Sequence, residues 1–154
     1  SVGEADYVKD VLDEIGEVNF WKIAMKPGRP LSFGRIGDSL FFGLPGNPVS
    51  VMVTFYQFVL PALRRLSGET NWQPLRLQAR TVDRLKKRPG RTEFQRGVLS
   101  QDDTGALVVS TTGEQGSGIL SSMSQANCFV ILPIDSAGAQ PGDLVEVEPF
   151  LGLV

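Results

Sequence analysis

The chemistry open to this 154-residue chain is limited by two counts, because it has no histidine and one cysteine. Without histidine, a serine or cysteine nucleophile lacks its usual base, and histidine-ligated metal sites are excluded. Cys128 begins an apolar run, which favours a small core residue over a nucleophile. Carboxylates, lysine, arginine, hydroxyls and backbone amides remain, and they suit the binding of anions and of hard cations such as Mg²⁺.

Two segments of the N-terminal part could bind an anion. Residues 1–6 (SVGEAD) form a small-residue loop before an expected helix, where backbone N–H groups favour an anion and Asp6 could hold Mg²⁺. Composition alone favours the plainer alternative that Asp6 only caps the helix. Lys22 and Lys26 lie four apart on an expected strand, so they should share one face. An anion-binding pair and a solvated strand face are equally compatible with that spacing.

Residues 44–50 (LPGNPVS) carry the sharpest local signal. Asn47 is a strong N-cap residue, and Pro48 suits the first helical position. Ser50 would place a hydroxyl in the first turn, beside free backbone N–H groups. Pro45 and Pro48 stiffen this loop more than capping requires, which indicates an oxyanion site as well as a strand-to-helix turn.

The charge pattern argues against nucleic acid as a partner. The net charge is −2, whereas nucleic-acid binders usually carry a basic excess. Five of the 15 lysines and arginines do fall within residues 84–91, but no aromatic side chains alternate with them. We interpret most of this run as a solvated turn. A glycine-rich segment at residues 113–118 could bind an anion or simply connect two strands.

The elements that would position these residues fall into two groups. Residues 1–67 predict an α/β unit with a helix at 7–15, whose apolar face carries Tyr7, Val8, Val11, Leu12 and Ile15. Strands at 18–25, 31–36 and 39–43 follow, and then a helix from Pro48 to about Leu66, bent near Pro61. Residues 68–154 predict a small antiparallel β-sandwich or barrel, with strands at 75–85, 92–99, 106–110, 128–132 and 144–148.

A membrane span is not expected. No charge occurs between Asp38 and Arg64, but glycines and prolines leave only residues 49–60 as an unbroken apolar helix. Crossing a bilayer takes about 20 apolar residues. The first residues also lack a basic and apolar leader, so a cytoplasmic location is expected.

Five stretches resemble the molybdopterin molybdenumtransferase family, the MoeA and gephyrin E-domain group. The main ones are residues 1–7 (SVGEADY), 22–30 (KIAMKPGRP) and 43–50 (GLPGNPVS), supported by 89–96 (PGRTEFQR) and 112–117 (TGEQGS). They occur in family order over nearly the whole chain. The resemblance implies that 1–67 is the C-terminal part of a molybdopterin-binding, MogA-like three-layer domain. It implies that 68–154 is a small all-β barrel domain.

The resemblance also implies a reaction. Family members insert molybdenum from molybdate into adenylylated molybdopterin, release AMP, require Mg²⁺ and work as homodimers. By motif, Asp6 matches the acid of the metal and phosphate site, and Lys22 and Lys26 match lysines that face the anionic substrates. Pro45 and Pro48 match the rigid loop, and Ser50 a hydroxyl near molybdate. Arg91 and Ser117 match β-domain residues that close over the site, while Arg29 replaces a lysine often seen after Lys-Pro-Gly and is assigned no role.

The resemblance leaves alternatives. The family's Thr-Gly-Asp-Glu-type phosphate motif is absent from these 154 residues, so the chain is expected to be a C-terminal fragment that holds half a site. Whether this fragment is active on its own stays open. A molybdopterin adenylyltransferase is one alternative, although its stand-alone forms lack a β-domain. A gephyrin-like dimeric scaffold that binds peptides is another. The expected partners are a second copy, the adenylyltransferase and apo-molybdoenzymes.

Overall fold

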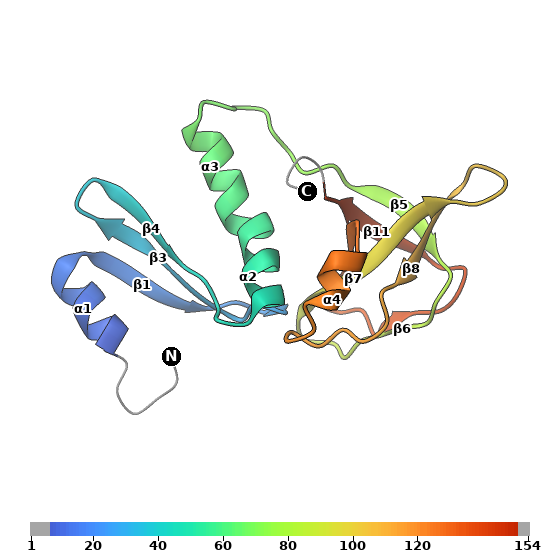
Figure 1. Cartoon of the computed structure of the whole chain (residues 1–154), viewed down its shortest axis with the longest axis horizontal. Helices are drawn as coiled ribbons and strands as arrows, with labels where there is room; N and C mark the ends of the chain where they lie inside the picture. The colour runs from blue at the N-terminus through green and yellow to red at the C-terminus, as the bar shows by residue number, and fades with distance from the viewer. Residues whose placement is uncertain (1–6, 151–154) are drawn as a thin grey trace.

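The computed structural model describes residues 7–150, with an α/β part followed by a barrel (Figure 1). Asp6, the predicted metal ligand, lies outside the described residues. Helix α1 (Tyr7–Ile15) leads into an antiparallel sheet of order β1-β3-β4, formed by β1 (Glu17–Lys22), β3 (Pro30–Ile36) and β4 (Ser39–Gly43). The bounds of α1 match the prediction. On its apolar face Leu12 is buried, whereas Tyr7, Val11 and Ile15 are at least half exposed.

The predicted strand at 18–25 is wrong in its second half. Strand β1 ends at Lys22, and the short β2 (Met25–Lys26) instead pairs in parallel with β7 of the barrel. The chain changes direction because the Ile23 N–H donates to the Arg29 carbonyl at 2.8 Å, which closes a loop. Lys22 and Lys26 therefore do not share one strand face, and the spacing argument that paired them fails.

The helix predicted from Pro48 is continuous to Leu66 but is not α-helical throughout. It comprises α2 (Pro48–Thr54), a π-helical segment η1 (Phe55–Val59) and α3 (Leu60–Leu66). The Leu60 N–H reaches back five residues to the Phe55 carbonyl. Pro61, which lacks an N–H, follows directly. The irregularity predicted near Pro61 is therefore a π segment, a known way of accommodating an interrupted hydrogen-bond ladder.

The second part forms a closed five-stranded barrel, which decides between the predicted sandwich and barrel. Contrary to the prediction, the barrel is not antiparallel throughout, because β5 and β8 pair in parallel. The ring runs β7-β8-β5-β11-β9 and closes through β9 and β7. Its elements are β5 (Leu77–Thr81), β6 (Leu85–Lys86), β7 (Thr92–Gln101), β8 (Leu107–Thr111), α4 (Ser121–Gln125), β9 (Cys128–Leu132), β10 (Gly138–Ala139) and β11 (Leu144–Pro149). The predicted strand at 75–85 is split, because β6 leaves the ring and pairs with β10.

Two apolar cores hold this arrangement. One fills the barrel and includes Cys128, as predicted, and burial raises the pKa of that thiol to about 12, so it stays protonated. The other joins the continuous helix formed by α2, η1 and α3, here called the central helix, to the outside of the barrel. It contains Val49, Val53 and Tyr56 from the helix, with Phe129 and Ile131 from β9. The central helix thereby anchors the α/β part to the barrel.

Within residues 7–150, no helix is both long and apolar enough to cross a membrane.

Candidate functional site

Two cations come together where β1 ends and β3 begins. Lys22 is the last residue of β1 and pairs with Pro30, the first residue of β3. Arg29 precedes Pro30, and its carbonyl accepts the Ile23 N–H. The loop between the two strands therefore places Arg29 beside Lys22, although the family resemblance assigned Arg29 no role.

A third cation comes from the barrel. Strand β2 pairs in parallel with the start of β7, so that Met25 lies opposite Thr92. The Thr92 N–H also donates to the Ala24 carbonyl at 2.9 Å. These contacts bring Arg91, the residue before β7, to the loop that carries Lys22 and Arg29.

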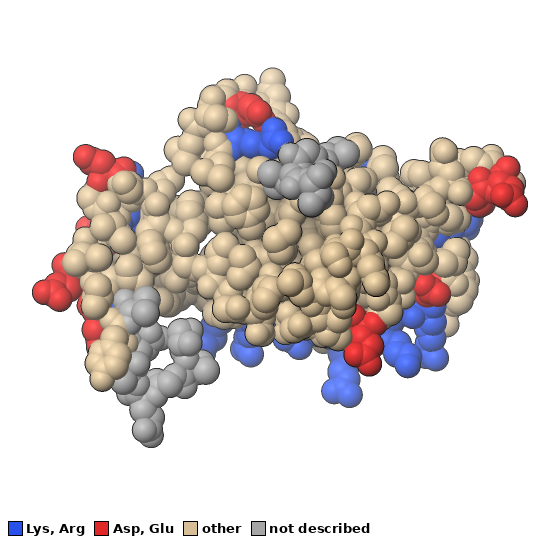
Figure 2. All heavy atoms as spheres, viewed as in Figure 1, with Lys and Arg blue, Asp and Glu red and all other residues tan. Residues whose placement is uncertain are grey.

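The three cations line one open pocket of about 340 Å³. Its lining comprises Lys22, Ile23, Ala24, Arg29, Gly90 and Arg91. All three charged side chains are exposed, and none of the described lining residues is acidic. Figure 2 shows lysine and arginine side chains gathered along the lower edge of the molecule. Such a pocket favours a small multivalent anion, since ammonium and guanidinium groups make charge-assisted hydrogen bonds to its oxygens.

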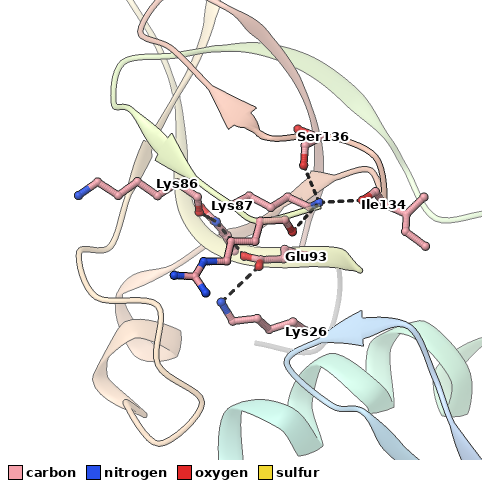
Figure 3. A network of polar contacts seen from close by, with 8 residues as sticks. Lys26, Lys86, Lys87, Glu93, Ile134 and Ser136 are labelled. Atoms are coloured by element: carbon pink, nitrogen blue, oxygen red, sulfur yellow. Dashed lines mark hydrogen bonds and ion pairs between the residues drawn. The ribbon is translucent and has the colours of Figure 1, made fainter. Parts of the chain in front are cut away.

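Lys26 is not among the residues that line this pocket, and its side chain contacts the barrel instead (Figure 3). Its Nζ forms an ion pair with Glu93 Oε1 at 3.2 Å, and the Glu93 side chain is almost fully buried. Gln95 Nε2 donates to the other Glu93 oxygen at 3.2 Å and to the Lys86 carbonyl at 2.9 Å. Glu93 therefore fixes the direction of Lys26. The sequence signal for Glu93 was its place in residues 89–96, but no role was inferred for it.

The loop that carries Pro45 and Pro48 contacts the barrel through Asn47. Asn47 occupies the N-cap position of α2, as predicted, but its side chain makes no capping hydrogen bond. Its Nδ2 instead donates to Ser117 Oγ at 3.2 Å, across 70 positions of the sequence. Pro48 is at the start of α2, and Pro45 is half-buried in the preceding loop. The structure thus brings Ser117 to the proline loop.

Ser50 lies in the first turn of α2, where the spacing placed it, and only 4% of the residue is exposed. Its carbonyl accepts a hydrogen bond from Thr54 Oγ1 at 2.7 Å. Gly28 packs directly against this turn, since a Cβ at that position would meet Thr54 Oγ1 at 2.5 Å. Gly28 also has a φ of 93°, so both the close approach and the backbone require glycine. This contact holds the loop that carries Lys26 and Arg29 against α2.

A buried arginine supports the segment that carries Ser117. Arg96 is 1% exposed, and its guanidinium donates to Ser122 Oγ at 2.9 Å and to the Gly116 carbonyl at 3.0 Å. Desolvation by burial lowers the pKa of Arg96 from its usual range. The Gln115 side chain accepts the Arg96 backbone N–H at 2.7 Å. These contacts tie residues 113–118 to β7.

The described residues do not fit a magnesium site. Within residues 7–150, no group of three or more metal-ligating side chains comes together. The pocket offers cations, whereas Mg²⁺ prefers carboxylate and other oxygen ligands. The magnesium expectation therefore rests on Asp6 alone.

Comparisons with known proteins match both parts of the chain. Residues 1–65 match the family model described as a probable molybdopterin binding domain, and residues 78–150 match that of the MoeA C-terminal region, domain IV. The boundary predicted between residues 67 and 68 falls between the two matches and stays a prediction.

Individual relatives agree with these family models. A molybdopterin molybdenumtransferase from Haemophilus influenzae is 46% identical over 97% of this chain and 37% of its own length. A gephyrin from Dictyostelium discoideum is 37% identical over 95% of this chain and 24% of its own. A crystal structure of a molybdopterin biosynthesis MoeA protein from Pyrococcus horikoshii superposes with a TM-score of 0.74 at 26% identity, covering 97% of this chain and 39% of that one.

The chain thus spans between a quarter and two fifths of the length of these relatives. The two matched domains, their order along the chain and the similar MoeA structure all agree with one family. The chain belongs to the molybdopterin molybdenumtransferase family, the MoeA and gephyrin E-domain group.

Proposed function

We propose that the pocket formed by Lys22, Arg29 and Arg91 binds molybdate, and that the whole protein inserts its molybdenum into adenylylated molybdopterin with release of AMP. The observation that carries this proposal is the convergence of three cations from three segments on one pocket whose described lining has no acid. Molybdate is a small dianion, so a pocket of this charge favours it over neutral ligands.

Support for the reaction comes from the relatives, several of which are named molybdopterin molybdenumtransferase. On the resemblance, we further propose Mg²⁺ dependence through Asp6, a homodimer, and a cytoplasmic location. The adenylyltransferase that supplies the substrate and the apo-molybdoenzymes that receive the product are proposed as further partners.

The described residues divide the work in this proposal. Lys22, Arg29 and Arg91 hold the oxyanion, and Lys26, which lies between Lys22 and Arg29 in the chain and pairs with Glu93, is a further cation of the same segment. By the family resemblance, Ser117 and the proline loop, which Asn47 joins by a hydrogen bond, are assigned to the same site. Because three like charges repel one another, the empty pocket is electrostatically unfavourable, and a bound dianion relieves that repulsion.

The test is AMP release from adenylylated molybdopterin by the whole protein in the presence of molybdate. Arg91→Ala should lower the rate at least 10-fold, because a charge-assisted contact worth roughly 1.5–3 kcal/mol is lost. Arg84→Ala is the matched control, since Arg84 is an exposed arginine of the same basic run that does not line the pocket. Equal rates for the two variants would contradict the proposal. Formation of adenylylated molybdopterin from ATP would identify an adenylyltransferase instead.

A further inference from the structure

One lysine of the basic run at residues 84–91 is buried, and the proposed reaction does not use it. Arg84, Lys86 and Arg88 are exposed, whereas Leu85 and Lys87 between them are buried. This alternation is the period of two that a strand imposes. Lys87 is therefore the exception among the basic residues of this run, which are otherwise exposed, and its side chain points into the protein.

The ammonium of Lys87 joins two segments of the barrel through backbone carbonyls alone (Figure 3). Its Nζ donates to the Ser136 carbonyl at 2.8 Å, to the Ile134 carbonyl at 3.1 Å and to the Arg88 carbonyl at 3.3 Å. Three acceptors match the three N–H donors of a lysine. Within residues 7–150 Lys87 forms no ion pair with a carboxylate. These three hydrogen bonds compensate for the burial of the charge, and they also fix the positions of the three carbonyls.

The hydrogen bonds of Lys87 to the three carbonyls form a clamp, and the Ile134 carbonyl connects this clamp to the candidate site. It also accepts the Gly90 N–H at 2.9 Å, so Lys87 and the turn before Arg91 share one acceptor. Gly90 has a φ of 103°, a conformation that suits glycine in such a turn. Gly90 and Arg91 both line the pocket.

We propose that Lys87 is a positioning residue that holds the turn at residues 88–91 so that Arg91 faces Lys22 and Arg29. This inference rests on the proposed function of the pocket. Because the three pocket cations repel one another, a turn carrying Arg91 needs a fixed attachment to keep that charge in place before an anion arrives. A buried ammonium with three directional donors supplies the attachment, whereas an apolar side chain of similar size would fill the space without fixing the carbonyls.

The experiment measures the dissociation constant of this chain for molybdate by isothermal titration calorimetry. Lys87→Met keeps an unbranched stem and removes the three donors. Lys86→Met is the matched control, because Lys86 is the neighbouring lysine with an exposed side chain on the opposite face of β6. We expect Lys87→Met to raise the dissociation constant roughly 3- to 10-fold and Lys86→Met to change it less than about 2-fold.

A double-mutant cycle separates positioning from general destabilisation. In an Arg91→Ala background, Lys87→Met should have no further effect on affinity, because the side chain that it positions is gone. An undiminished effect in that background, or unchanged affinity in the folded single variant, would overturn the inference. If Lys87→Met fails to fold, Lys87→Arg, which keeps charge and donors but alters their geometry, goes through the same cycle.

Failure of the proposed function gives a different result. In that case Arg91→Ala alone would bind molybdate as tightly as the unmodified chain, whatever Lys87→Met does. The backbone amide resonance of Arg91 then still tests the clamp. It should shift in Lys87→Met and not in Lys86→Met, and no difference between the two variants would overturn the positioning role.

Discussion

The two lysines of the 22–30 stretch differ in what they contact, and single substitutions should separate them. Lys22 is exposed at the pocket, while Lys26 pairs with the buried Glu93. Removing Lys22 takes a charge from the pocket and leaves no buried group unpaired. Removing Lys26 leaves the Glu93 carboxylate without its cation, and an uncompensated buried charge is costly.

We therefore predict that Lys22→Ala weakens molybdate binding and changes the free energy of unfolding by no more than roughly 0.5 kcal/mol. Lys26→Ala should weaken binding and also destabilise the fold by about 1–2 kcal/mol. Urea denaturation beside binding titrations measures both quantities. Lys26→Ala combined with Glu93→Gln should recover most of the stability, and a failure to recover it would show that Glu93 does not depend on Lys26.

The loop of Pro45 and Pro48 can influence the site only through its backbone geometry, because proline side chains donate no hydrogen bonds. Pro45 and Pro48 restrict the backbone on both sides of Gly46 and Asn47, and Asn47 contacts Ser117. Helix α2 is held by the burial of Val49 and Val53, which the prolines do not provide.

Replacing both prolines by alanine should therefore lower AMP release by the whole protein about 10-fold or more, since small displacements at a site are costly to rate. The melting temperature should shift by only about 2–4 °C, the equivalent of 1 kcal/mol for a chain of this size. Activity and stability falling together would mean that the prolines maintain the fold and not the site.

A second element, η1, faces a buried carboxyl on the barrel. Gln57 Nε2 donates to Glu148 Oε1 at 2.9 Å, while Arg76 Nε is 3.4 Å from Glu148 Oε2 without making a hydrogen bond. Burial raises the pKa of Glu148 above its ordinary value of 4.5, and the Gln57 hydrogen bond and the Arg76 charge only partly oppose that effect. Above this raised pKa the folded state carries a poorly solvated carboxylate that the unfolded state does not.

The sign of the pH dependence follows from this shift. Below pH 4.5 the carboxyl is protonated in both states and contributes no penalty; as the pH rises from there through the folded-state pKa, the penalty grows. We predict that Glu148→Gln, which keeps an acceptor for Gln57, is more stable than the unmodified chain near about pH 8 and that its advantage shrinks toward pH 4.5. Thermal melts across that range measure it. A constant difference would rule out ionisation of Glu148 as the cause.

Across the whole molecule, local sequence patterns predicted most helices and strands. They did not predict which strands pair when the partners are distant in sequence. Apolar periodicity and turn residues placed α1, the β3-β4 hairpin and the start of α2 at Pro48, since these depend on neighbouring residues. The break after Lys22 was missed, because it depends on pairing with β7 some 67 positions later, as between Met25 and Thr92. The contact of Asn47 with Ser117 and the inward direction of Lys87 were missed for the same reason, since both depend on residues distant in sequence.

The candidate site was predictable only in part for the same reason. Residue types and the family resemblance identified Lys22 and Arg91, but only the parallel pairing of β2 with β7 shows that they line one pocket. Arg29 and Glu93 lay within the recognised stretches and were given no role, since their function depends on neighbours distant in sequence. The core that joins the central helix to β9 holds the α/β part and the barrel together, so the pocket forms only in the folded molecule.

If three cations from separate segments form one molybdate site, calorimetric titration of this chain with molybdate should detect it. The unmodified chain should bind molybdate, and Lys22→Ala, Arg29→Ala and Arg91→Ala should each weaken binding about 10-fold, while Arg84→Ala changes it little. Raising the salt concentration should weaken binding, as expected for exposed charges. Equal affinity in Arg84→Ala and in the three pocket variants would show that these three cations do not form a molybdate site.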